Sequence, residues 1–190
     1  MPNRDEGIRE KVTIDVANPE DARAIREVMK RGWLSTFVHE SEKYHITPED
    51  VEDRFKDFLS EENLKRFTAE LADSNKLKFL VAKAKGEIVG VCGLIKSPGP
   101  HYNKPISFFV DEEYRGAGIA LMHAVRKEFG ESSEDIKTDV VAYNDKALRL
   151  YGILGFEQVG EQFEREWKTR RGTVKQPMVN IVRKAKVIRE

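Results

Sequence analysis

Residues 105–120, with the sequence PISFFVDEEYRGAGIA, constrain the fold of this chain more than any other stretch. The apolar run from Ile106 to Val110 predicts a buried strand, and a short polar bend over 111–114 follows it. Gly116 and Gly118 then precede an amphipathic helix. Its apolar face is formed by Leu121, Met122, Val125 and Phe129. A strand, a glycine turn and a helix start present free backbone N–H groups and the positive end of the helix dipole, so they predict a site for a phosphorylated ligand.

Three helices are expected before the main sheet. A short strand over Val12–Val16 precedes the first helix, which Asn18 and Pro19 begin and which is expected to run to about Phe37. Thr47 and Pro48 repeat this start signal for a second helix, and Ser60 begins a third. The inward faces are predicted to be Ala22, Ile25, Met29 and Trp33, then Val51, Phe55 and Phe58, then Leu64, Phe67 and Leu71.

The rest of the chain predicts a sheet of hairpins around the central stretch. The expected strands are Leu77–Ala84 and Ile88–Ile95 with a tight turn at Lys85-Gly86, Ile136–Ala142, and a final hairpin of Phe156–Trp167 and Val174–Lys184. Residues Ser97–Lys104 are predicted to form a loop because they contain Pro98, Gly99 and Pro100. Asn144 is expected to cap a short helix that ends at Gly155. This order predicts one α+β domain over residues 12–190, after a flexible tail over residues 1–11.

The composition excludes several classes of protein. The 190 residues include 33 basic and 33 acidic side chains, so the formal net charge is zero and gives no general attraction to nucleic acid or to an anionic membrane. The polar first residues contain neither a secretory signal core nor a membrane span. The single cysteine, Cys92, excludes an intramolecular disulfide and is expected in the core. A cytoplasmic protein is therefore expected.

Several phosphate sites compete for the glycine turn. A P-loop needs a lysine followed by Ser or Thr after its last glycine, but Ile119-Ala120 stands there. A dinucleotide fingerprint needs a third small residue three positions after Gly118, and Leu121 occupies this place. The pyrophosphate of coenzyme A remains, next to the alternative that the glycines only shape a turn.

The sequence around the turn resembles the GNAT superfamily, the GCN5-related N-acetyltransferases. Arg115, Gly118 and Ala120 have the spacing Arg-x-x-Gly-x-Ala, which is similar to the acetyl-CoA motif of that family. The segment from Asn144 through Tyr151 to Phe156 resembles a second family segment, Asn-x-x-Ala-x-x-x-Tyr-x-x-x-Gly-Phe. The likeness covers residues 77–160 well, and residues 12–74 match in element order alone.

This resemblance implies a single GNAT-fold domain with a mixed, mostly antiparallel twisted sheet of about seven strands flanked by helices. It also implies that acetyl-CoA is the acetyl donor, that no metal is needed, and that a homodimer is plausible. The residues implied to bind the cofactor are Phe108, Phe109, Val110, Arg115, Gly116, Ala117, Gly118, Ile119, Ala120, Asn144, Ala147 and Tyr151. Acetyl transfer to an amine needs stabilisation of the carbonyl oxygen, for which a backbone N–H near Phe109 or Val110 is the candidate.

Tyr151 is the candidate general acid for the departing thiolate. An ordinary tyrosine pKa of about 10 keeps its hydroxyl protonated at neutral pH, although its place on an apolar helical face also suits a structural residue. The general base stays open between His39, Glu40, His101 and Asp139. The four histidines show no metal-ligand spacing with the single cysteine.

The amine acceptor is expected to contact Trp33, Phe37 and Glu40. Tyr44, Phe55 and Phe58 are further candidates for this pocket, although aromatic residues at helical spacing are more often core. The acceptor is expected to be a primary amine of a small molecule, a peptide N-terminus or a protein lysine.

Two other functions remain as alternatives. One is a domain of the same fold that senses acetyl-CoA or binds a partner without catalysis. The other, nucleic-acid binding, rests only on the basic residues near the last hairpin tip, Lys168, Arg170, Arg171 and Lys175.

Overall fold

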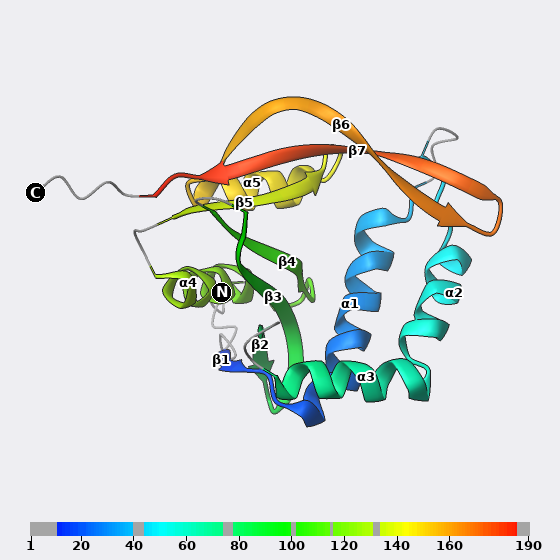
Figure 1. Ribbon diagram of the computed structural model, residues 1–190, viewed down its shortest axis with the longest axis horizontal. Helices are drawn as coiled ribbons and strands as arrows, with labels where there is room; N and C mark the ends of the chain where they lie inside the picture. The colour runs from blue at the N-terminus through cyan, green and yellow to red at the C-terminus, as the bar shows by residue number, and fades with distance from the viewer. Residues whose placement is uncertain are drawn as a thin grey trace, which may run out of the picture.

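A computed structural model describes residues 11–39, 44–73, 78–99, 102–114, 116–130 and 134–185 (Figure 1). The first part of the chain forms β1 (Thr13–Val16), η1 (Pro19–Asp21), α1 (Ala22–Phe37), α2 (Pro48–Phe58) and α3 (Glu61–Ala72). The second part forms β2 (Lys78–Ala84), β3 (Glu87–Gly99), β4 (Tyr102–Val110), α4 (Ala117–Phe129), β5 (Asp135–Val141), α5 (Asp145–Ile153), β6 (Glu157–Thr169) and β7 (Gly172–Arg183).

The strands form one seven-stranded sheet in the order β1-β2-β3-β4-β5-β7-β6. Neighbouring strands are antiparallel except for β4 and β5, which are parallel. The prediction of a mixed, mostly antiparallel sheet in a single α+β domain is therefore confirmed. The β4–β5 pair is thus the one parallel pair among the described strands of an otherwise antiparallel sheet.

Side-chain caps begin the helices where the sequence predicts them. Asn18 and Thr47 form capping boxes with Asp21 and Asp50, each of which bonds back to the backbone N–H of its cap residue. Ser60 accepts from the amide of Asn63 at the start of α3. Each cap satisfies backbone donors that the helix itself leaves unpaired, so local sequence decides where these helices begin.

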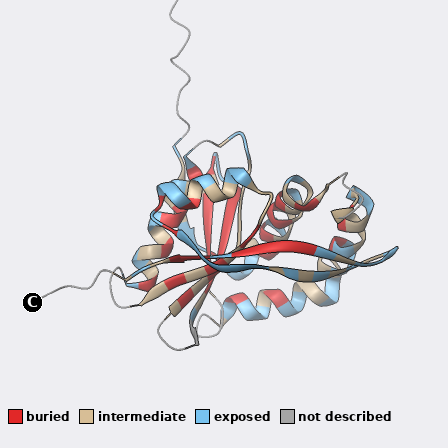
Figure 2. Cartoon of the chain, turned by 90° about the horizontal axis from the view of Figure 1, so that it is seen from above, coloured by how far each residue is buried: buried red, intermediate tan, exposed pale blue. Residues whose placement is uncertain are grey.

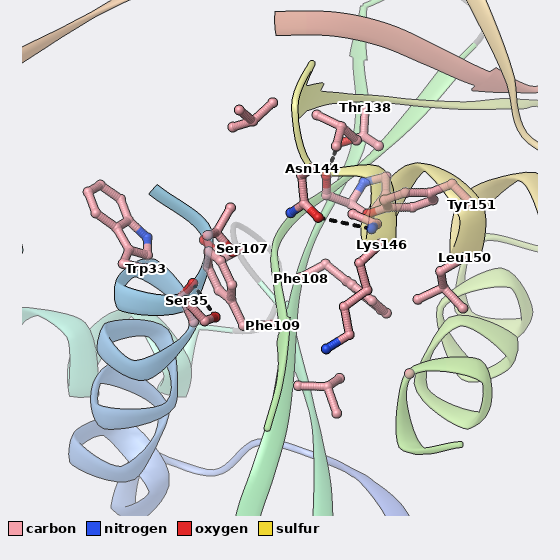
Figure 3. Close-up of a pocket in the computed structure, with 18 of the residues that line it drawn as sticks. Trp33, Ser35, Ser107, Phe108, Phe109, Thr138, Asn144, Lys146, Leu150 and Tyr151 are labelled. Carbon is pink, nitrogen blue, oxygen red and sulfur yellow. Dashed lines mark hydrogen bonds between the residues drawn. The ribbon is translucent and has the colours of Figure 1, made fainter. Parts of the chain in front are cut away.

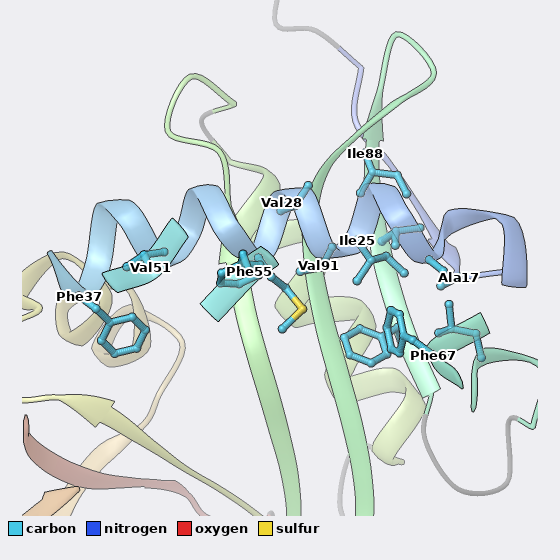
Figure 4. Packing of buried hydrophobic residues seen from close by; sticks show 14 of the residues in the cluster. Ala17, Ile25, Val28, Phe37, Val51, Phe55, Phe67, Ile88 and Val91 are labelled. Carbon is cyan, nitrogen blue, oxygen red and sulfur yellow. The ribbon is translucent and has the colours of Figure 1, made fainter. Parts of the chain in front are cut away.

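Helices cover both faces of the sheet, and alternate residues of each strand face opposite cores. In β2, Phe79 and Val81 pack with buried residues of α1, α2 and α3, whereas Leu80 packs with α4. Figure 4 shows Ile25, Val28, Phe55 and Phe67 of the first core gathered beside Val91. The central strands are buried between helices whose outer faces are exposed (Figure 2).

The prediction of a loop over Ser97–Lys104 was wrong. Strand β3 continues to Gly99 and β4 begins at Tyr102, with Ile95 opposite Lys104 and Gly99 opposite Tyr102. The register shifts between Ile95 and Gly99, so the ladder is irregular at Pro98, a residue that has no N–H to donate. Pairing with the neighbouring strand therefore overrides the local turn signal.

No helix in the described part of the chain is both long enough and apolar enough to cross a membrane.

Candidate active site

Strands β4 and β5 pair only at their beginnings and then separate. The parallel ladder joins Tyr102 to Asp135 and Asn103 to Ile136. Just beyond it, the Thr138 hydroxyl donates to the carbonyl oxygen of Pro105 at 3.0 Å. Past this bond a cavity of about 620 Å³ extends between the two strands, α1, α4 and α5 (Figure 3). The parallel pair thus opens into a cavity within the sheet.

Strand β4 contains a bulge beside this cavity. Val91 lies opposite Phe109 and Gly93 lies opposite Ile106, so two residues of β4, Ser107 and Phe108, face Cys92 alone. Ser107 has a φ of 50°, a left-handed conformation that non-glycine residues rarely adopt. A strained residue at the wall of a cavity is a common sign of a functional constraint.

The bulge is followed by an amide that points away from β3. The Asp111 amide donates to the Val89 carbonyl at 2.8 Å, on the β3 side. Successive amides of an antiparallel strand point in opposite directions, so the Val110 N–H is directed toward the β5 side. Val110 lines the cavity, and its N–H is therefore placed to donate to a ligand between the strands.

The glycine turn leaves further backbone donors beside the same cavity. Gly116 adopts a φ of 90° and begins α4 without a side-chain cap. The first helical bond runs from the Ala120 amide to the Gly116 carbonyl at 3.0 Å. The amides of Gly118 and Ile119 consequently have no partner within the helix, and both residues line the cavity. These amides and the helix dipole make the turn a favourable site for a phosphate.

Asn144 lies across the cavity from α1, at the start of α5. Its Oδ1 accepts the Ala147 amide at 3.0 Å, as predicted for a helix cap. This bond orients the side chain so that its NH₂ group is left on the cavity side (Figure 3). Asn144 therefore combines a structural role with a free donor.

Tyr151 is buried at the α5 wall of the cavity. Its ring centroid lies 5.9 Å from that of Phe108 and 5.1 Å from that of Phe156. Burial raises the pKa of Tyr151 well above its ordinary value, and the nearby Cys92 and Asp139 groups raise it further. The hydroxyl therefore stays protonated across the physiological range.

An aromatic wall closes the other end of the cavity. The Trp167 ring centroid lies 4.6 Å from that of Trp33 and 4.7 Å from that of Phe37. The Arg54 guanidinium packs on Trp33 at 4.8 Å from the ring centroid. Phe55 is fully buried behind this wall and lies in the core. Tyr44 and Phe58 do not line the cavity either.

Asp139 lies at the same end and is clamped by two cations. Lys104 Nζ lies 2.8 Å from one carboxylate oxygen and Arg165 Nη1 lies 2.7 Å from the other. Burial works to raise the pKa of Asp139, but the hydrogen bonds from Arg165 and Lys104 outweigh it, so the pKa is lowered. This carboxylate is consequently a weak base.

The cavity brings together most of the predicted site residues. Those that line it are Trp33, Phe37, Phe108, Phe109, Val110, Gly116, Gly118, Ile119, Asn144, Ala147 and Tyr151. Ala117 is buried beneath the turn, and the amides of Ala117 and Ala120 already donate within the protein. Arg115 and Glu40 lie outside the described residues, so their roles remain predictions.

Of the two base candidates that the structure describes, His39 and Asp139, the second lines the cavity. His39 does not line it, and its ring lies 4.6 Å from that of Tyr143. His101 lies outside the described residues. Cys92 is fully buried, and burial raises the pKa of its thiol, so it stays protonated as expected of a core residue. Within the described chain, no group of three or more His, Cys, Asp and Glu could hold a metal ion.

Sequence reasoning missed several residues that line the cavity. The most consequential are Lys104, Ser107, Thr138, Lys146, Arg165 and Trp167. Alternation along the final hairpin could have placed Arg165 and Trp167 on one face, but no local signal marks Lys104 or Ser107.

The basic residues at the last hairpin tip are engaged within the chain. Arg170 forms an ion pair with Asp53. Arg171 Nη2 lies 3.1 Å from Asp50, and Lys175 Nζ lies 3.3 Å from Glu164. These pairs neutralise most of the patch on which nucleic-acid binding would depend.

A family model described as "Acetyltransferase (GNAT) domain" matches residues 39–172. No curated protein matches the sequence.

Solved structures with the same fold cover nearly the whole chain. The PaiA N-acetyltransferase from Thermoplasma acidophilum, in complex with coenzyme A, is 18% identical with a TM-score of 0.63, covering 92% of this chain and 99% of that one. A GNAT-family acetyltransferase from Streptococcus pneumoniae is 18% identical with a TM-score of 0.61, with the same coverage. The ribosomal-protein-S18-alanine N-acetyltransferase from Escherichia coli is 16% identical with a TM-score of 0.59, covering 95% and 97%. At these identities the likeness shows the fold alone.

Proposed function

The chain belongs to the GNAT acetyltransferase family, and we propose that it transfers an acetyl group from acetyl-CoA to a primary amine of a small molecule, peptide or protein. The observation that carries this proposal is the joint position of two sets of backbone donors. The Val110 amide and the free amides at the start of α4 border one cavity, which opens where β4 and β5 separate. A thioester and a pyrophosphate on one extended molecule need donors at two such places.

Two observations support acetyl-CoA as the acetyl donor. The protein from Thermoplasma acidophilum was solved with coenzyme A, and it shares this fold. In the present chain, Gly118 and Ile119 offer amides to the pyrophosphate, and the edge of β4 from Phe108 to Val110 offers main-chain groups to the pantetheine arm. Asn144 adds its NH₂ group.

The proposed reaction is a direct attack of the amine on the thioester carbonyl. The amine nitrogen forms the new C–N bond, and the Val110 N–H stabilises the oxygen as it becomes negative. The C–S bond then breaks, and Tyr151 gives its proton to the leaving thiolate. The amine nitrogen loses one proton to solvent, and one proton from solvent restores the Tyr151 hydroxyl, so the protons balance. No enzyme nucleophile is needed, which agrees with the inert position of Cys92.

Calorimetry and a thiol-release assay test this function together. Acetyl-CoA is titrated into the wild type, Gly118→Glu and the control Gly152→Glu. A carboxylate at position 118 would block the turn and repel the pyrophosphate, so we expect affinity to fall at least ~100-fold. Position 152 is an exposed helical site with no atom within 4 Å of an added Cβ, so the Gly152→Glu variant should bind acetyl-CoA with wild-type affinity. Wild-type affinity in Gly118→Glu would refute the docking of acetyl-CoA at this turn.

The competing function is an acetyl-CoA-binding module without catalysis. The thiol-release assay is run with polyamines, amino acids, aminoglycosides and peptides as acceptors. Release that depends on one acceptor class supports the enzyme. Binding of acetyl-CoA with no release across the whole panel would support the module instead.

A further inference from the structure

We call the end of the cavity that contains Asp139 and the aromatic wall of Trp33, Phe37 and Trp167 the acceptor end. It has an excess of positive charge. Lys104 and Arg165 face the single carboxylate of Asp139, which leaves one positive charge among the three. Arg165 is the most exposed of them, with 41% of its side chain accessible against 11% for Asp139. Among the described residues, its ion pair with Asp139 engages Nη1, and the guanidinium carbon lies 5.9 Å from the centroid of the Phe163 ring. Its remaining guanidinium N–H donors are open to a ligand.

The described part of the cavity lining offers no carboxylate for a second ammonium group. Three acidic residues line it, and each is already paired with a cation. Arg31 binds Asp111 at 2.6 Å, Lys146 binds Glu112 at 2.7 Å, and two cations hold Asp139. A polyamine would need such a carboxylate, so the charges disfavour this class of acceptor.

An apolar surface adjoins the Arg165 guanidinium. Arg165 and Trp167 are two residues apart on β6 and therefore project from the same face. Trp167 packs against Trp33 and Phe37, and Met178 also lines the cavity. A large apolar substituent is the complement of this surface.

We propose that the acceptor is an α-amino acid with a large apolar side chain, and that Arg165 binds its carboxylate while the aromatic wall binds its side chain. This inference rests on the proposed acetyl transfer and names its substrate class.

The test compares free amino acids with their amides in the thiol-release assay. L-phenylalanine, L-methionine and L-leucine are each paired with the corresponding primary amide, which keeps the amine and side chain but lacks the carboxylate. We expect kcat/KM to be about tenfold or more higher for each acid, mainly through KM, as is typical of one charged hydrogen bond. An amide also mimics a peptide N-terminus, so equal or better use of the amides would overturn the proposal in favour of peptide acceptors.

Variants assign the effect to Arg165. In Arg165→Gln the preference for acids should fall to about one, because KM rises for the acids and changes little for the amides. Lys168→Gln on the exposed neighbouring position of the same strand should keep the wild-type preference. Equal loss with acids and amides in Arg165→Gln would contradict a carboxylate contact. Unchanged affinity for acetyl-CoA verifies that the variant is folded.

A binding measurement separates this inference from the proposed function. L-phenylalanine is titrated into the CoA-saturated protein, with binding expected in the wild type and absent in Arg165→Gln. Acetylation of amines without any dependence on a carboxylate would overturn the inference and leave acetyl transfer standing. Failure to bind acetyl-CoA at all would instead refute the proposed function.

Discussion

At the residue scale, two titratable groups that line the cavity, Tyr151 and Asp139, are held in opposite protonation states. Burial raises the pKa of Tyr151, so the hydroxyl keeps the proton that an acid needs. Asp139 is only partly buried, and hydrogen bonds from Arg165 and Lys104 overcome the effect of burial and lower its pKa. The difference lies in the partners, since a phenol packed between rings has no cation beside it.

Tyr151→Phe tests the proton-donating hydroxyl. The change removes one oxygen and keeps the ring that packs on Phe108 and Phe156, so we expect kcat to fall about 10²-fold with the affinity for acetyl-CoA unchanged. Because burial raises the tyrosine pKa, the wild-type kcat should show no loss from its ionisation below pH ~10. Stopped assays across pH and calorimetry supply both readouts. A kcat equal to that of the wild type would reject the general acid.

Asp139 gives a prediction about stability and pH. Its pKa is lower in the folded than in the unfolded protein, so the unfolded chain binds more protons between the two values and the stabilisation disappears as pH falls through the folded pKa. We expect Asp139→Asn to be clearly less stable than the wild type at pH 7, because Lys104 and Arg165 then repel each other. The difference should shrink below pH ~4. Urea unfolding at pH 7, 5 and 3 measures it, and a difference that stays constant with pH would contradict the assignment.

At the element scale, the close approach of α1 to β4 shapes the cavity. A methyl group added at Gly32 would lie 2.3 Å from Cδ1 and 2.7 Å from Cβ of Phe109, so the helix can approach the strand only because position 32 has no side chain. The adjacent Trp33 and, one turn later, Phe37 of the same helix line the cavity. The distance between these two elements therefore sets the width of the acceptor end.

Gly32→Ala is expected to push α1 away from β4. Overpacking of this kind costs about 1–3 kcal/mol of unfolding free energy, and KM for the acceptor should rise as Trp33 and Phe37 move. Gly152→Ala is the matched control, since that helical glycine has open space around it and should stabilise by about 0.5–1 kcal/mol. Phe109→Leu in the Gly32→Ala background should recover part of the loss. Thermal unfolding and acceptor kinetics measure both effects, and a stabilised Gly32→Ala would exclude the clash.

At the scale of the whole molecule, the β6–β7 hairpin ties the end of the sheet to the helical layer. Figure 1 shows the hairpin extending from the sheet toward α1 and α2. Its tip is joined to α2 by the pairs of Arg170 with Asp53 and Arg171 with Asp50, formed between residues about 120 positions apart. Trp167 lies just before this tip, so the docking of the hairpin also fixes the aromatic wall.

The double variant Arg170→Ala/Arg171→Ala is expected to loosen the hairpin without unfolding the protein. Both arginine side chains are more than half exposed, and ion pairs of this kind contribute little, so the unfolding free energy should fall by only about 1 kcal/mol. Hydrogen exchange should accelerate at the amides near Trp167 and Val174, and KM for the acceptor should rise. The Asp50 side chain also caps α2, which is why the arginines are changed instead. Lys175→Ala is the control. If amides near Trp167 and Val174 exchange at the same rate in the double variant and in Lys175→Ala, the tip pairs do not hold the hairpin.

The sequence by itself determined where most elements begin and end. Caps at Asn18, Thr47, Ser60 and Asn144 are local devices, because a side chain bonds to backbone amides two or three residues away. The glycine turn and its helix were predicted for the same reason. Most of the proposed cofactor residues came from the resemblance of two short motifs, each of which is contiguous in the chain.

Only the tertiary structure decided the shape and charge of the site. The opening between β4 and β5, the left-handed Ser107 and the clamp of Lys104 and Arg165 on Asp139 depend on contacts between different strands. Ser107 of β4 lies in a bulge against β3, and the clamp joins β4, β5 and β6. The failed loop over Ser97–Lys104 has the same origin, since a pairing partner extended strands that local signals had ended. Local preferences amount to about 1 kcal/mol per residue, whereas the ladder and core contacts made by distant strands are worth more together, so they prevail.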